Sequence, residues 1–198
     1  MHADEYTPLR KFASQLVDFT ESEWCAHRDL LTRRFLRKGE FLLQAGEVCN
    51  HVSFINAGSL RFFIEVRDQE ISKHFLFEHE YASDYSSFLT RKPGIINIKA
   101  LEECEVMELS YEKVQLLYRL FPVWQKYGRL IAENLFIQVA SRTQELLLRS
   151  PEEMYIRLIE EQSPIIERIP LHYIASYIGI QPESLSRIRK RIMEPKRV

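Results

Sequence analysis

The segment 169–190 constrains the fold of this chain more than any other stretch. Pro170 can begin a short helix, because a first-turn N–H has no helical partner to lose. Gly179 can then adopt the positive φ that ends a helix, and Pro182 suits the first turn of a second helix. The apolar spacing predicts that the two helices pack together as a helix-turn-helix. The residues expected to face the interior are Ile174, Ala175, Ile178, Leu185 and Ile188.

The second helix has an outer face that is polar and basic. From Leu185 onward there are six basic residues, Lys196 and Arg197 among them, against the single acidic residue Glu194, although the whole chain has a formal net charge of only −1. This concentration of charge is typical of a surface that binds a polyanion, and a solvated tail gives a similar pattern. Such a helix fits a DNA major groove, with early residues at base edges and late basic residues on phosphates. We therefore expect DNA contacts from Gln181, Pro182, Glu183, Ser184, Arg187, Arg189, Lys190 and Arg191.

Residues 35–109 have the pattern of a β-sandwich or jelly roll. Short runs rich in Phe, Ile, Leu and Val are separated by turns that contain Gly, Asn and Asp. Residues 9–31 predict two short helices, with Thr20 and Glu23 as a capping box. We interpret Arg33 and Arg34 as part of a solvated edge between helix and strand.

Residues 122–149 predict one long helix. After Pro122 this segment has no proline and a single glycine, and apolar residues recur every three or four positions. One small sandwich cannot bury the whole stripe, so we expect a helix of a second copy to cover it, with an intramolecular connector as the alternative. Farther along, a helix restarts near Pro151, and Pro164 predicts a short strand or extended segment over 165–169. The residues expected at the dimer contact are Trp124, Tyr127, Ile131 and Leu135.

The sequence argues against an enzyme. It has no Ser-His-Asp order with a supporting motif, no glycine loop that would hold a phosphate and no cluster with metal-ligand spacing. Cys25, Cys49 and Cys104 are odd in number and far apart, which argues against a disulfide framework or a metal site. We therefore expect no catalytic residue, no metal and no cofactor. Because there is no signal peptide and no apolar run of membrane length, we expect a cytoplasmic protein with no membrane partner.

Several segments together resemble the bacterial Crp/Fnr transcription regulators. They are 38–40 with 45–47, 54–61, 104–111, and 174–179 with 185–190. The resemblance implies an α+β protein with a β-sandwich (jelly-roll) sensor domain like the cyclic nucleotide-binding domains, a long dimerisation helix and an all-α or winged-type helix-turn-helix domain. It also implies a homodimer on a two-fold symmetric site of double-stranded DNA, with RNA polymerase as a possible further partner. The boundaries that follow are 1–121, 122–149 and 150–198, and the base-reading trio is Pro182, Glu183 and Arg187.

The sequence departs from the family pattern at the positions that form the nucleotide pocket. In relatives that bind cyclic AMP, a Gly-Glu pair holds the ribose and a later Arg pairs with the phosphate; the corresponding positions here are Ser83-Asp84 and Gly94-Ile95. Gly94 cannot pair with a phosphate, so we expect that cyclic AMP is not the effector. Arg91 and Lys92 stay open as substitutes, and the effector is unknown or absent. The pocket is lined for an apolar ligand or filled by its own side chains, and the residues we place there are Phe62, Phe75, Asp84, Tyr85, Arg91 and Lys92.

Two other interpretations of the effector site, and one of the function, follow from the residues. An iron–sulfur sensor would need four cysteine ligands, which the sequence lacks. Haem would need a ligand from scattered histidines such as His51, His74 and His79, which are more typical of surface or satisfied residues. The alternative function is a ligand-sensing or scaffold protein whose helix-turn-helix contacts protein rather than DNA.

Overall fold

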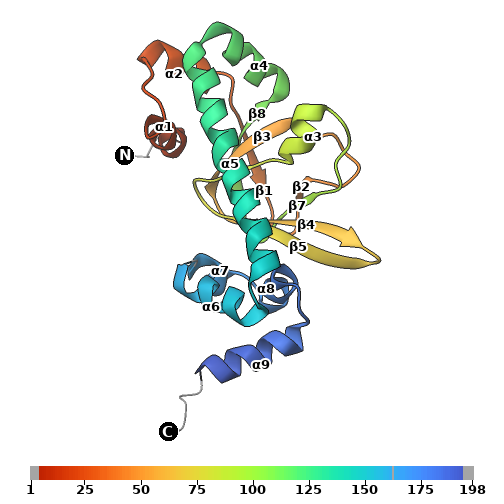
Figure 1. Cartoon of the computed structure of the whole chain (residues 1–198). Helices are drawn as coiled ribbons and strands as arrows, with labels where there is room; N and C mark the ends of the chain where they lie inside the picture. The colour runs from red at the N-terminus through yellow and green to blue at the C-terminus, as the bar shows by residue number, and fades with distance from the viewer. Residues whose placement is uncertain (1–4, 162, 194–198) are drawn as a thin grey trace.

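The computed structural model describes residues 5–161 and 163–193, and its first part is a β-sandwich (Figure 1). One antiparallel sheet has the strand order β1-β8-β3-β6 and the other has the order β2-β7-β4-β5. The predicted sandwich is therefore confirmed. Its strands are β1 (Thr32–Leu36), β2 (Phe41–Leu43), β3 (His51–Ala57), β4 (Leu60–Val66), β5 (Gln69–Leu76), β6 (Tyr81–Ala82), β7 (Asn97–Ala100) and β8 (Cys104–Ser110).

Helices α1 (Thr7–Ser14) and α2 (Glu21–Arg28) precede the sheets, and α3 (Tyr85–Thr90) lies between β6 and β7. Thr20 and Glu23 form the expected capping box at the start of α2. Arg33 and Arg34, interpreted from the sequence as part of a solvated edge between helix and strand, lie in β1, where they form ion pairs with Glu105 and Glu108 of the neighbouring β8. Cross-strand pairing allows arginines within a strand, because opposite charges on adjacent strands attract.

The long helix α5 (Pro122–Leu148) follows α4 (Tyr111–Leu120) and runs along the sandwich to the C-terminal helices (Figure 1). Its first turns belong to the sandwich core, because Trp124 and Tyr127 are buried against their own chain. These two residues, which the sequence placed at the dimer contact, are therefore already covered. Ile131 and Leu135 are half-buried. The exposed large apolar residues lie farther along, at Phe136, Ile137, Val139, Leu146, Leu147 and Leu148.

The C-terminal part consists of α6 (Pro151–Glu161), α7 (Ser163–Arg168), α8 (Leu171–Ile178) and α9 (Pro182–Met193). The expected strand or extended segment over 165–169 is wrong, since this segment is largely helix α7. Pro164 lies in the first turn of α7, where a missing N–H breaks no helical hydrogen bond. Ile165 and Ile169 are one turn apart and both are buried in the second core.

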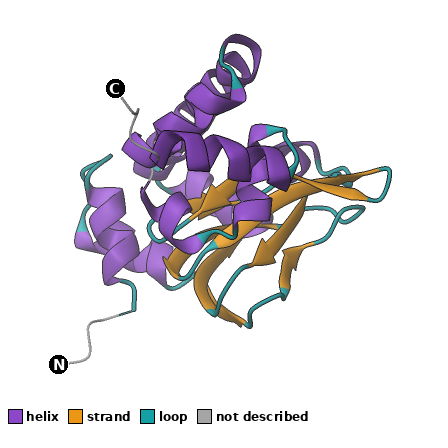
Figure 2. Ribbon diagram, turned by 90° about the horizontal axis from the view of Figure 1, so that it is seen from below, coloured by secondary structure: helices purple, strands orange, loops and turns teal. Residues whose placement is uncertain are grey.

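Two separate clusters of buried residues match these two parts of the chain. The first fills the sandwich and includes residues of α1, α2, α4 and the start of α5. The second is formed by α6–α9 and includes one residue of the sandwich, Phe75 of β5. Seen from below, the strands lie together at one side of the molecule (Figure 2). None of the described helices is both long enough and apolar enough to span a membrane.

Candidate functional site

The helix-turn-helix is formed by α8 and α9. Gly179 ends α8 with a φ of 87°, and its N–H donates to the carbonyls of Ala175 and Ser176. A residue with a Cβ would be strained at this φ, which explains the glycine. Leu185 of α9 is completely buried and packs in the same core as Ile174 and Ile178 of α8. The apolar spacing thus fixes which face of α9 remains outside.

The outer face of α9 is exposed and carries most of the expected DNA-binding residues. Glu183, Arg187 and Lys190 are spaced by four and three positions, so they share one side of the helix. The guanidinium of Arg187 donates to the hydroxyl of Ser184 at 3.1 Å, which orients the arginine along the helix. Of the other expected residues, Gln181 lies in the turn between α8 and α9, and Pro182 begins α9. Arg189 and Arg191 lie on the exposed surface of α9.

Arg191, near the end of α9, is held by α6. It forms an ion pair with Glu152, and its Nε donates to Glu152 Oε1 at 3.2 Å. The pair lies at the surface, so its contribution to stability is small. It does direct Arg191 toward α6. Glu194, Lys196 and Arg197, which the charge argument also used, lie outside the described residues.

A cavity of about 390 Å³ opens in the sandwich between β2, the loop before β3, β6 and β8. Two carboxylates line it, from Glu47 and Glu108. Glu108 is buried on the inner face of β8 and lies 3.5 Å from both Arg34 Nη1 and Ser53 Oγ. Among the described residues that line the cavity there is no lysine or arginine. The carboxylates of Glu47 and Glu108 disfavour an anion in this cavity.

None of the six residues that the sequence assigned to an effector pocket lines this cavity. Phe62 is part of the sandwich core, and Phe75 packs on Tyr177 in the helical core. Arg91 donates to the carbonyls of Cys49 at 2.9 Å and Phe88 at 3.3 Å, and its guanidinium lies 4.4 Å from the ring of Tyr111. The remaining three residues lie at α3: Asp84 directly before it, Tyr85 at its first position and Lys92 shortly after its end.

The sequence pattern did not reveal the cavity-lining Glu47 and Glu108. A signal was present for Glu108, since it is the one charged residue in the apolar run Val106–Leu109. A buried charge requires a partner or access to water, so a carboxylate in such a run points to a polar interior feature. Within the part of the chain that the structure describes, no group of three or more His, Cys, Asp or Glu side chains could hold a metal ion.

Comparisons with known proteins place this geometry in a wider context. Residues 33–119 match the family model of the cyclic nucleotide-binding domain. FixK2 from Bradyrhizobium japonicum is similar in structure, with 15% identity, 82% of this chain and 84% of that chain covered, and a TM-score of 0.70. A structure described as a transcriptional regulator of the Crp/Fnr family, from Eubacterium rectale, shares 18% identity over 88% of this chain and 84% of that chain, with a TM-score of 0.70. The chain has the Crp/Fnr fold.

The Crp/Fnr fold is also seen in the c-di-GMP-responsive global regulator CLP from Xanthomonas campestris. That protein shares 15% identity over 87% of this chain and 91% of its own, with a TM-score of 0.68. A search among proteins of curated function found no match to the sequence.

Gly94, which the resemblance aligns with a phosphate-binding arginine, lies beside the carboxylate of Asp84. A Cβ added to Gly94 would come within 2.1 Å of Asp84 Oδ2. The other oxygen of Asp84 accepts the N–H of Ser87 at 3.2 Å and caps α3. An arginine side chain could not enter here without displacing Asp84. The negative charge of Asp84 would also repel a phosphate.

Proposed function

We propose that this chain is a DNA-binding transcription regulator of the Crp/Fnr type, which binds a two-fold symmetric operator as a homodimer. The single observation that carries the proposal is the exposed face of α9, with Glu183, Arg187 and Lys190 aligned on it, held by a packed helix-turn-helix. A regulator of this kind works without catalytic residues. The location in the cytoplasm and the contact with RNA polymerase stay predictions from the sequence.

The chemistry of α9 suits base readout at its start and phosphate contacts toward its end. Arg187 can donate two hydrogen bonds to O6 and N7 of guanine, and Glu183 can accept from the amino group of cytosine. Arg189 and Lys190 follow within one turn and can pair with phosphates on either side of the groove. Two copies of α9 would read half-sites about 34 Å apart, which is one turn of DNA.

The second copy is expected on the exposed side of α5. Ala132, Phe136, Val139, Thr143 and Leu146 are spaced by four, three, four and three positions, which is the seam of a two-stranded coiled coil. Phe136 is 73% exposed and Val139 is 57% exposed in the single chain. Covering them with the same residues of a second copy removes this apolar surface from water.

The proposed regulator does not respond to cyclic AMP. Asp84 faces Gly94 where a phosphate partner would be needed, and the cavity next to it is lined by Glu47 and Glu108. Burying a phosphate beside carboxylates without a cation is costly. Titration calorimetry of the purified protein with cyclic AMP should therefore show no saturable heat. A stoichiometric complex would contradict this part of the proposal.

The experiment that tests DNA binding begins with selection of an operator from a random-sequence pool. Arg187→Ala should weaken binding to the selected operator about 10- to 100-fold, the range of one good bidentate base contact. Binding to random DNA should change much less. Arg119→Ala, an exposed arginine on α4, is the matched control and should bind as the unchanged protein does. Enrichment of no sequence, even at low salt, would favour the alternative in which the helix-turn-helix contacts protein.

A further inference from the structure

The helix-turn-helix packs against an exposed edge of the sandwich. β5 is the last strand of its sheet, so one side of its backbone has no neighbouring strand in the described part of the chain. The hydroxyl of Ser176 in α8 accepts the N–H of Ser72 at 2.9 Å and donates to the carbonyl of Glu70 at 2.9 Å. One side chain thus satisfies two backbone groups of an edge strand, which would otherwise need water or another chain.

A buried arginine joins the same two parts of the molecule. Arg61 of β4 is only 1% exposed, and its Nε donates to the hydroxyl of Ser72 at 2.9 Å. It also forms an ion pair with Glu70. Its guanidinium lies 3.8 Å from the ring centre of Tyr173 in α8 and 4.5 Å from that of Phe63. A desolvated cation between two aromatic rings is strongly attracted to both.

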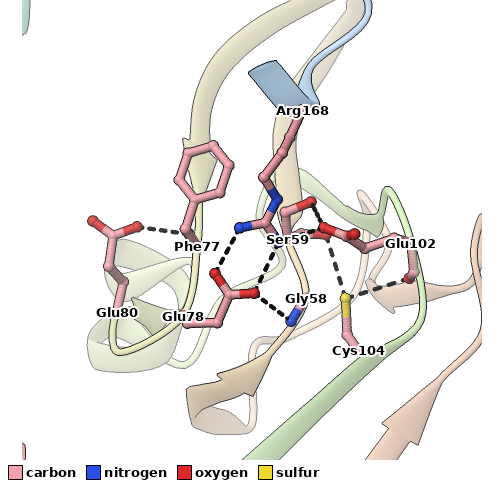
Figure 3. Close-up of polar contacts among 8 residues, drawn as sticks. All are labelled: Gly58, Ser59, Phe77, Glu78, Glu80, Glu102, Cys104 and Arg168. Carbon is pink, nitrogen blue, oxygen red and sulfur yellow. Dashed lines mark hydrogen bonds and ion pairs between the residues drawn. The ribbon is translucent and has the colours of Figure 1, made fainter. Parts of the chain in front are cut away.

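A second point of attachment lies at Arg168, at the end of α7 (Figure 3). Its guanidinium donates to both carboxylate oxygens of Glu78, at 2.7 and 2.8 Å, and to Glu102 at 2.6 Å. Glu78 also accepts the N–H of Gly58 at 2.9 Å. The bidentate bond from Arg168 lowers the pKa of Glu78 to about 2. This carboxylate therefore remains charged and paired at neutral pH.

These contacts leave the outer face of α9 open. Ser176 and Tyr173 belong to α8, Arg168 belongs to α7, and α9 lies at the far end of the molecule from the sandwich (Figure 1). The sandwich therefore holds the helix-turn-helix without covering the residues proposed to read DNA. An arrangement of this kind can preorganise the recognition helix, because its orientation is fixed before DNA is bound.

We infer that Ser176 and Tyr173 are positioning residues: by docking α8 on the edge of β5 and on Arg61, they fix the orientation of α9 relative to α5, and hence the half-site spacing that the dimer accepts. This inference rests on the proposed DNA-binding function. Ser176 and Tyr173 themselves need no contact with DNA.

The test uses Ser176→Ala and Tyr173→Leu in the full-length chain. Three DNA duplexes are compared: the selected operator, the same operator with one base pair inserted between the half-sites, and a single half-site. Both variants should lose about tenfold in affinity for the selected operator, the loss expected for a preorganising contact that includes one or two hydrogen bonds. They should bind the single half-site as the unchanged protein does, and they should discriminate less against the altered spacing.

Two matched controls separate the docking contact from general effects of substitution. Tyr173→Phe keeps the ring over Arg61, and Ser86→Ala removes an exposed hydroxyl of α3. Both should behave as the unchanged protein. Unaltered spacing preference in Ser176→Ala and Tyr173→Leu would overturn the inference. Tighter binding in these variants would also overturn it, because the docking would then be inhibitory.

Amide hydrogen exchange measures the contact between α8 and β5 in the absence of DNA. The Ser72 amide should exchange slowly in the unchanged protein and at least about tenfold faster in Ser176→Ala, because that amide loses its acceptor while the sandwich core stays protected. A Ser72 amide that is unprotected in the unchanged protein would refute the docking itself. Selection that enriches no operator would instead refute the proposed function, so the two failures are distinguishable.

Discussion

At the scale of single residues, His27 makes the clearest case for an effect of pH. It stacks among aromatic rings, with its ring centre 4.4 Å from that of Trp124 and 5.7 Å from that of Trp24, and its Nδ1 has no hydrogen-bond partner among residues 5–161 and 163–193. Burial lowers the pKa of His27 to about 4. The imidazole takes up a proton near pH 6.5 in the unfolded chain. The contribution of neutral His27 to the free energy of unfolding is therefore fully present above that pH and is lost as the pH falls toward 4. Between pH 7 and pH 5 the loss from His27 is about 2 kcal/mol.

His27→Phe should remove the part of the pH dependence that comes from His27, about half of what His27 and His74 give together, since phenylalanine keeps the ring and cannot take up a proton. Urea unfolding at pH 7 and pH 5, followed by the fluorescence of Trp24 and Trp124, measures it. His74, whose pKa is also lowered to about 4 by burial and by Arg142, leaves a residual slope. His172→Phe, on the exposed surface of α8, is the control. If His27→Phe and the unchanged protein lose the same unfolding free energy between pH 7 and pH 5, His27 does not cause the pH dependence.

From residue types alone, the lack of a phosphate partner at Gly94 could be predicted, but the contacts of Asp84 and Arg91 could not. That Gly94 cannot pair with a phosphate follows from its lack of a side chain. That Asp84 fills the space beside it, and that Arg91 is bound to two carbonyls rather than available to a ligand, depends on the path of the loop around α3. Contacts between residues about 40 positions apart, such as Arg91 and Cys49, leave no periodic signal in a sequence.

At the scale of elements, α5 shows what periodicity can and cannot determine. The sequence predicted its length to within one residue at its end, because proline and apolar spacing mark a helix well. The sequence did not show which part of α5 packs on its own domain and which part stays exposed. The first turns bury Trp124 and Tyr127 in their own domain, whereas the exposed apolar residues lie beyond them. In the proposed dimer, α5 packs first on its own chain and farther along on a second copy, so its sequence combines two apolar stripes.

The dimer contact can be tested with one charged substitution in α5. Phe136→Glu should convert the dimer to a monomer, because it would place two carboxylates in the apolar seam, one from each copy. Sedimentation equilibrium at micromolar concentration measures the mass directly. Gln138→Glu adds the same charge at an exposed position outside the heptad seam and should stay dimeric. A Phe136→Glu protein that keeps the mass of a dimer would place the interface elsewhere.

At the scale of the whole molecule, charge is distributed very unevenly. The formal net charge is −1, yet α9 alone carries Arg187, Arg189, Lys190 and Arg191 against Glu183. The bulk of the protein therefore repels DNA weakly while one end attracts it, so binding should depend on a small number of phosphate contacts. The docking of α8 on β5 keeps this basic end at the far tip of the molecule (Figure 1).

This distribution predicts a steep but limited dependence of operator binding on salt. If Arg189 and Lys190 of each copy contact phosphates, four contacts give a slope of log K against log salt of about −3.6, and affinity falls about a hundredfold between 50 and 200 mM salt. Lys190→Ala should reduce the slope by about two, one contact from each copy, and should weaken all DNA sequences alike. Lys11→Ala, an exposed lysine of α1, should leave the slope unchanged. A Lys190→Ala protein with the original slope would show that this end of α9 does not face the phosphates, and α9 would then need a different orientation in the groove.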